Sequence, residues 1–246
     1  MIIKTEGIII KTLDYGEGNK ILTVFTGNYG KISLMARGAK KTKSRLSGVT
    51  QLFTHGEFVF YKGTQMGTLN QGEILHRFAE IQKDIQKTAY VAYIVELVDR
   101  MVESEQPEPF LYQQLLSSIE QINEGKDNEI VARIFEMKML KNAGYLPNLY
   151  SCSLCGSEKG AFTLSIADGG LVCQEHINHP TITIQEGTLK LLRIFDQMDI
   201  RRLGDINVKA STKSQLQFIL RSFFDEYVGI EFKSRHFLDQ MKKYNL

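Results

Sequence analysis

The first 80 residues alternate between short apolar runs and stretches rich in turn-forming residues, a pattern typical of β-strands. The runs cover residues 2–11, 20–26, 31–36, 51–62 and 68–78. Glycine-rich turns at 27–30 and 63–67 connect neighbouring runs as hairpins. Five strands without a helical pattern between them predict a small closed barrel. An OB-type barrel is the interpretation we favour, and an SH3-like barrel fits the strand count almost as well.

From residue 84 the apolar positions recur every three to four residues, which predicts helices. Prolines precede the second helix and glycines follow several others, as is typical of helix ends. We expect helices over residues 84–103, 107–125, 128–143, 186–198, 212–228 and 233–243. The chain is therefore predicted to be an α+β protein. An OB-fold domain would cover 1–80, and a helical domain would cover 81–246 with a small insert at about 147–180.

Positive charge gathers in residues 36–46, hereafter the basic arm, between the third and fourth predicted strands. Arg37, Lys40, Lys41, Lys43 and Arg45 place five cations within nine residues, with no acid among them. Residues 1–80 carry 11 Lys and Arg against 6 Asp and Glu, whereas the remainder carries 19 against 22. A segment that carries this much charge cannot be buried. It is either an ordinary solvated loop or an arm that binds phosphates.

The three cysteines form a pattern of metal ligands. Cys152 and Cys155 make a CxxCG motif, and after 17 further residues Cys173 and His176 make a CxxH motif. Short apolar runs at 161–166 and 171–173 predict a hairpin that returns the second pair to the first. This spacing predicts one closed, structural zinc site, with His179 as an alternative fourth ligand. The alternative is that the cysteines are free or simply buried.

No catalytic centre emerges from the sequence. There is no phosphate-binding GxxxxGK[ST] loop, no GxSxG and no informative carboxylate pair. Residues 55–57 match the HxE of zinc deaminases, but they lie about 95 residues from the CxxC, where Ser151 replaces the required proline. No apolar run reaches the roughly 18 residues of a membrane span, and the N-terminus does not read as a signal peptide. We expect a cytoplasmic protein that is not an enzyme and has no small-molecule substrate.

Aromatic residues in the barrel half are candidates for stacking on bases. Phe58 and Phe60 share one face of their strand, so most of the aromatic side chains there are expected to fill the barrel. Tyr15 and Tyr29 lie in predicted turns and are freer. Any of these that is exposed beside the basic arm could stack on a nucleobase.

Four segments resemble the RecO family of bacterial recombination-repair proteins. They are the basic arm, the stretch GYLPNLYSCSLCG at 144–156, the Cys173/His176 pair, and Lys233-Ser234-Arg235 with Phe237-Leu238. Position 176 is His, where many members have Cys. The resemblance covers nearly the whole chain and, unlike the basic run alone, it is specific.

The resemblance implies a DNA-binding mediator with an OB domain, a helical domain and a zinc module. Such a protein would bind single- and double-stranded DNA and anneal complementary strands in the nucleoid. With a RecR partner, it would help to load the RecA recombinase onto strands coated by single-strand-binding protein (SSB). Two other functions remain open: a zinc-containing scaffold for protein interactions, and an OB-fold binder of RNA.

Overall fold

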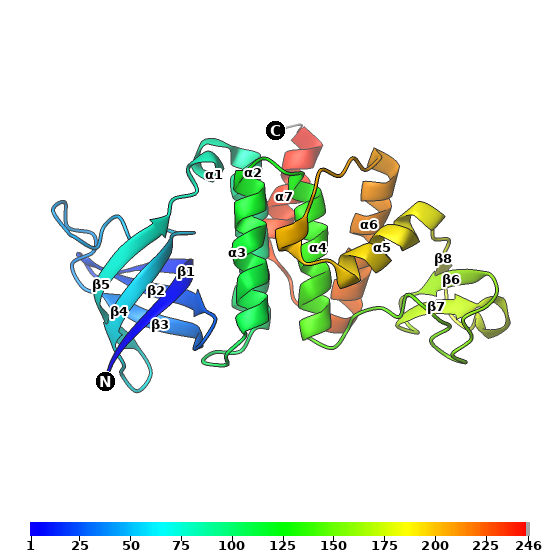
Figure 1. Cartoon of the computed structure of the whole chain (residues 1–246), viewed down its shortest axis with the longest axis horizontal. Coiled ribbons are helices and arrows are strands. Elements are labelled where there is room, and N and C mark those ends of the chain that lie inside the picture. Colours follow the sequence, from blue (N-terminus) through cyan, green and yellow to red (C-terminus); the bar gives the residue numbers. More distant parts are fainter. Residues whose placement is uncertain (245–246) are drawn as a thin grey trace.

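The computed structural model describes residues 1–244. A β-barrel forms one end of an elongated molecule, upright helices form its middle, and a small sheet forms the other end (Figure 1). The barrel strands are β1 (Ile2–Tyr15), β2 (Asn19–Thr26), β3 (Gly30–Ala36), β4 (His55–Tyr61) and β5 (Gly67–His76). The predicted α+β class is thus confirmed.

The barrel closes in the strand order β1-β2-β3-β5-β4, as expected for the OB type. β1 is long enough to pair with β4 through its first half and with β2 through its second half. All neighbouring strands are antiparallel except β3 and β5, which are parallel. Those two share only two paired positions, Leu34 with Gly67 and Met35 with Thr68. The barrel is therefore least complete between β3 and β5.

In the middle of β1 and at the end of β2 both faces are buried, because each face belongs to a different core. Ile9 and Leu22 point into the barrel. Ile8, Ile10 and Phe25 belong instead to the large core of the helices. Successive side chains of a strand alternate between its faces, so a continuous apolar run is the expected signature of such a strand.

Seven α-helices follow the barrel in the described part of the chain. Asp84 and Asp127 begin two of them, because each side chain accepts hydrogen bonds from two backbone N–H groups of the first turn. The predicted helix over 212–228 is in fact an α-helix followed by one π-helical stretch, Phe224–Val228, which ends at Gly229. The helices are α1 (Ala79–Lys83), α2 (Ile85–Met101), α3 (Pro109–Asn123), α4 (Asn128–Asn142), α5 (Glu186–Gln197), α6 (Ala210–Phe223) and α7 (Lys233–Tyr244).

The insert contains the expected hairpin, made of β6 (Phe162–Ser165) and β7 (Gly170–Cys173). A third strand, β8 (Thr181–Ile182), which the sequence pattern did not indicate, pairs with the other edge of β6. A 3-10 turn, Gln174–His176, follows β7 directly. Within the described residues no helix is both long and apolar enough to cross a membrane.

Candidate functional site

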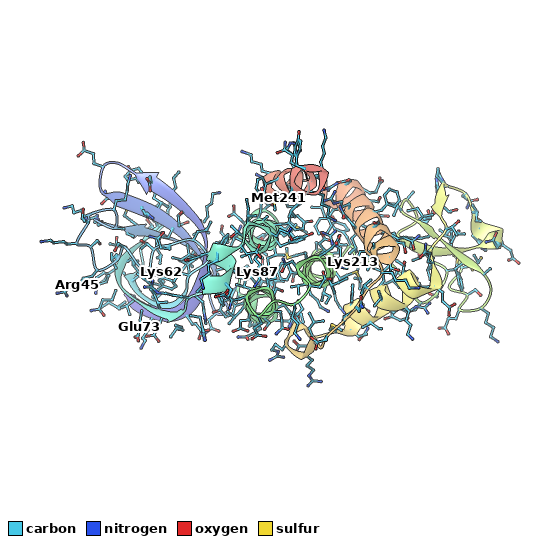
Figure 2. All side chains as sticks on the ribbon, turned by 90° about the horizontal axis from the view of Figure 1, so that it is seen from above. Arg45, Lys62, Glu73, Lys87, Lys213 and Met241 are labelled. Atoms are coloured by element: carbon cyan, nitrogen blue, oxygen red, sulfur yellow. The ribbon has the colours of Figure 1, made fainter. Side chains whose placement is uncertain are left out.

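The basic arm leaves the barrel as a series of tight turns rather than as a helix. Backbone N–H groups of Lys41, Ser44 and Ser47 each donate to the carbonyl three residues earlier, at 2.9–3.2 Å. The side chains of all five cations in the arm are exposed. Figure 2 shows Arg45 at the outer end of the barrel, far from the helices.

Two buried side chains hold the base of the basic arm against the barrel. Ala39 within the arm and Val49 just after it are each 2% exposed and belong to the barrel core. The arm is also tied to the β1–β2 turn, because Lys40 N–H donates to the Gly18 carbonyl and Gly38 N–H to Asn19 Oδ1. The cations therefore stand on a fixed base.

Most of the positive charge of the basic arm has no acidic partner. Lys40 Nζ lies 2.7 Å from Asp14 Oδ2, and this hydrogen bond holds the pKa of Asp14 below its usual value. Within residues 1–244, none of the other four cations forms an ion pair. The arm can therefore attract a polyanion.

The barrel aromatics separate into core and surface residues. Phe58 and Phe60 are buried in the barrel. Tyr15 is 54% exposed at the end of β1, and its backbone pairs with Asn19, which accepts a hydrogen bond from Gly38 of the arm, so Tyr15 is the predicted stacking candidate whose backbone lies near the base of the arm. Tyr29 and Tyr61 are also exposed on the barrel.

The insert brings its four predicted ligands together, and we call them the cysteine cluster: Cys152, Cys155, Cys173 and His176. Their sulfur and ring nitrogen atoms all lie within 4.8 Å of one another. Gly156, at φ +73°, allows the chain to turn so that its N–H donates to the Cys152 carbonyl at 2.8 Å. The 3-10 turn after β7 places His176 Nδ1 3.0 Å from Cys173 Sγ.

The donor set of the cysteine cluster fits a metal ion. The Cys155 and Cys173 sulfurs are 3.9 Å apart, close to the about 3.8 Å that tetrahedral zinc–thiolate geometry gives. Burial alone would raise the pKa of Cys152, but hydrogen bonds from the backbone N–H groups of Cys155 and Cys173, among others, lower it to about 6. Metals bind the thiolate form. The cluster could therefore hold one metal ion, and its four protein side chains would supply all the ligands of a tetrahedral site.

Other histidines and the C-terminal segment around residue 234 form contacts within the fold. His179 lies 3.9 Å from Asp168 and is not part of the cysteine cluster, so the geometry favours His176. His55 is buried, bonds Glu6 at 2.8 Å and stacks on His76. Lys233 and Ser234 donate backbone N–H groups to Glu96. Arg235 makes two hydrogen bonds to Asp225.

The fold and these sites define a class: an OB-type barrel with an exposed basic loop, joined to helices that carry a Cys3His cluster. Comparison with known families gives the same assignment. Residues 1–78 match the family described as Recombination protein O N terminal, and residues 82–236 match Recombination protein O C terminal. The chain therefore belongs to the RecO family.

Relatives named DNA repair protein RecO match this chain over all or nearly all of their length. A DNA repair protein RecO from Bacillus cereus (strain AH187) is 44% identical over 248 residues, covering 100% of both chains. One from Bacillus anthracis is equally similar. One from Halalkalibacterium halodurans is 46% identical over 244 residues, covering 98% of this chain and 96% of the relative. The chain is thus placed among proteins of DNA repair and recombination.

Proposed function

We propose that this protein is a non-enzymatic DNA-binding mediator of recombination repair. Its basic arm would bind the phosphates of single- and double-stranded DNA. One observation carries the proposal: the arm presents five exposed cations on a fixed base, and four of them have no acidic partner in the described chain. Phosphates carry no sequence information, so this contact suits a protein that acts on any strand.

The same charge would promote annealing of complementary strands. Two strands repel each other through their phosphates, and cations between them lower this repulsion. Membership of the RecO family supports the further steps: a RecR partner, contact with SSB, and assistance to RecA loading in the nucleoid. No step in this activity requires bonds to be made or broken.

We further propose that the cysteine cluster binds one structural zinc ion. Three thiolates and an imidazole form a tetrahedral set that zinc favours, and four protein donors leave no position for a substrate. The ion would supply folding free energy to a small insert whose own core consists of a few side chains, among them Phe162 and Val172.

A salt titration of oligonucleotide binding tests the role of the basic arm. Each phosphate contact on single strands contributes about −0.7 to the slope of log K against log salt. Changing Lys40, Lys41 and Lys43 to Gln should reduce the slope by about 2, or by about 1.4 if Asp14 keeps Lys40 from phosphate. The variant should keep its stability, because exposed pairs contribute little to folding.

The matched control changes Lys159, Lys190 and Lys209, three exposed lysines outside the barrel, to Gln. It removes the same charge and should leave the slope unchanged. If the arm variant keeps the wild-type slope, the arm is only a solvated loop. If RNA competes better than DNA at equal salt, the protein is instead an OB-fold binder of RNA.

A further inference from the structure

A pocket of about 140 Å³ opens at the incomplete seam between β3 and β5, and we call it the seam pocket. Ile32 lies two residues before Leu34 and shares its inward face. Leu34 is fully buried, whereas Ile32 is only half-buried. The barrel interior is therefore accessible at this point, because β5 pairs with β3 only from Leu34 onward.

The seam pocket combines apolar walls with a polar rim. Ile3, Ile32 and Phe60 line it from the barrel interior, and Tyr29 lines it from the β2–β3 turn. Polar residues also line it: Asn28, Ser33, Lys62, Gln65 and Glu105. The side-chain amides of Asn28 and Gln65 can both donate and accept hydrogen bonds. This lining suits a flat apolar ring that carries donors and acceptors on its edge.

The connection between α2 and α3 supports one side of the seam pocket. Glu105 N–H donates to the Lys31 carbonyl, which extends the edge of β3. Gly30 has a φ of +63°, and a Cβ there would lie 2.1 Å from the Gln106 carbonyl oxygen. Only glycine permits this close approach, so the α2–α3 connection packs directly against the start of β3 beside the pocket.

The seam pocket and the basic arm lie on the same strand. Ser33 lines the pocket and Arg37 begins the cationic run directly after β3, four residues later. At about 3.3 Å per residue the two backbone positions are roughly 13 Å apart. Nucleic acids cross OB-folds over strands 2 and 3 and the β4–β5 loop, and residues 62–66 of that loop border this pocket. Lys62 lies on the barrel between Arg45 and the helical region (Figure 2).

We infer that the seam pocket holds one unstacked nucleobase of a single DNA strand whose phosphates lie against the basic arm. This inference rests on the proposed function and deepens it. The base would enter beside Tyr29, its edge would face the amides of Asn28 and Gln65, and Lys62 would face the adjacent phosphate. The ion pair of Lys62 with Glu105 is long, at 4.0 Å, and both side chains are at least half exposed, so this weak pair can give way to a phosphate.

The test compares an oligo-dT strand with a strand of equal length that has abasic sites throughout. Wild-type protein should bind oligo-dT more tightly. Tyr29→Ala should weaken oligo-dT binding about five-fold or more, since stacking on an aromatic ring contributes that much per base, and should leave abasic binding unchanged. Tyr61→Ala is the control, because Tyr61 is exposed on the same barrel but does not line the pocket.

Photo-crosslinking of wild-type protein to a strand containing 5-iodouracil provides a readout that needs no variant. Crosslinks should form at Tyr29 or Met66, which also lines the seam pocket. Equal binding of the two strands, or crosslinks only elsewhere on the barrel, would overturn the inference. The two failures can be told apart. If the proposed function is wrong, binding of neither strand will be weakened by the substitutions in the basic arm. If only the seam pocket is wrong, those substitutions will weaken binding of both strands.

Discussion

Asp199 shows how one carboxylate can make the helical region sensitive to acid. Its oxygens accept hydrogen bonds from the Arg201 guanidinium at 2.5–3.0 Å and from Gln114 Nε2 at 3.0 Å. The Arg201 bonds, opposed by burial and assisted by Gln114, hold the pKa of Asp199 well below its usual range. Its stabilising contribution is therefore present above the unfolded pKa of about 3.9 and is lost progressively as pH falls from there through the lower pKa of the folded state.

Asp199→Asn should consequently lower stability at pH 7 and flatten the decline of stability as pH falls below about 4. Urea unfolding at several pH values measures this, since Asn can still accept from Gln114 but carries no charge for Arg201. Glu158→Gln, at an exposed site in the insert, is the control and should follow the wild-type curve. Parallel curves for wild type and Asp199→Asn would show that this carboxylate is not responsible.

Buried charges are the residues that the sequence pattern assigned least well. The helix over 128–143 was predicted from its apolar positions, yet Arg133, Glu136 and Lys138 are buried in α4 as well. Arg133 lies 2.9 Å from Glu136, which also accepts from the Tyr93 hydroxyl, and Lys138 donates to two carbonyls at the end of α5. Arg133 and Glu136 lie three residues apart on α4, but Tyr93 and the α5 carbonyls belong to other helices, and periodicity cannot indicate partners of that kind.

At the scale of elements, the basic arm was predictable in character but not in shape. Its charge excludes burial, and that charge can be read directly from the sequence. Its turns, however, depend on Asn19 and Gly18 in another hairpin, and on Val49, which inserts beside Gly72 of β5. The sequence pattern placed Val49 outside the arm and gave it no role. Contacts between segments far apart in the chain carry no local signal.

The insert was more predictable, because its ligand spacing is local, and it yields a prediction about metal. Cys155→Ser should abolish stoichiometric zinc and destabilise the insert, since three ligands hold the ion less well than four. Cys155 is exposed, so the substitution itself removes little packing. Elemental analysis and thermal unfolding of the full chain measure the two effects. The oligonucleotide salt slope should not change, because the basic arm lies on the barrel.

Ser153→Ala is the matched control for Cys155→Ser, since it alters the same turn and retains all four ligands. It should keep the zinc and the wild-type melting temperature. The prediction would be contradicted if wild-type protein contained no metal, or if Cys155→Ser melted at the same temperature as wild type with its zinc retained.

At the scale of the whole molecule, the barrel and the helices share one core. Ile8, Ile10 and Phe25 on the outer face of the barrel belong to the same cluster as α2, α3 and α4. Phe25 meets Tyr112 of α3 edge-on at 6.0 Å between ring centroids. Lys11 and Lys31 both reach Asp99 of α2. A prediction of two separate domains could not show that β1 and β2 are buried on both faces where the domains meet. The continuous apolar runs of these strands are, however, the sequence pattern that such burial produces.

This shared core predicts that barrel and helices unfold together, and that Phe25 couples them. Phe25→Ala should cost about 3–5 kcal/mol and should separate the two parts, because the lost contacts lie between them. Hydrogen exchange of β3 and α4 peptides in increasing urea tests this. Wild-type protein should lose protection in both at one urea concentration. In Phe25→Ala, β3 should open at lower urea than α4.

Leu22→Ala is the control, because it removes a side chain inside the barrel only. Both peptides should still open together in this variant, at lower urea than in wild type. Coincident opening in Phe25→Ala would show that other contacts suffice to join the two parts.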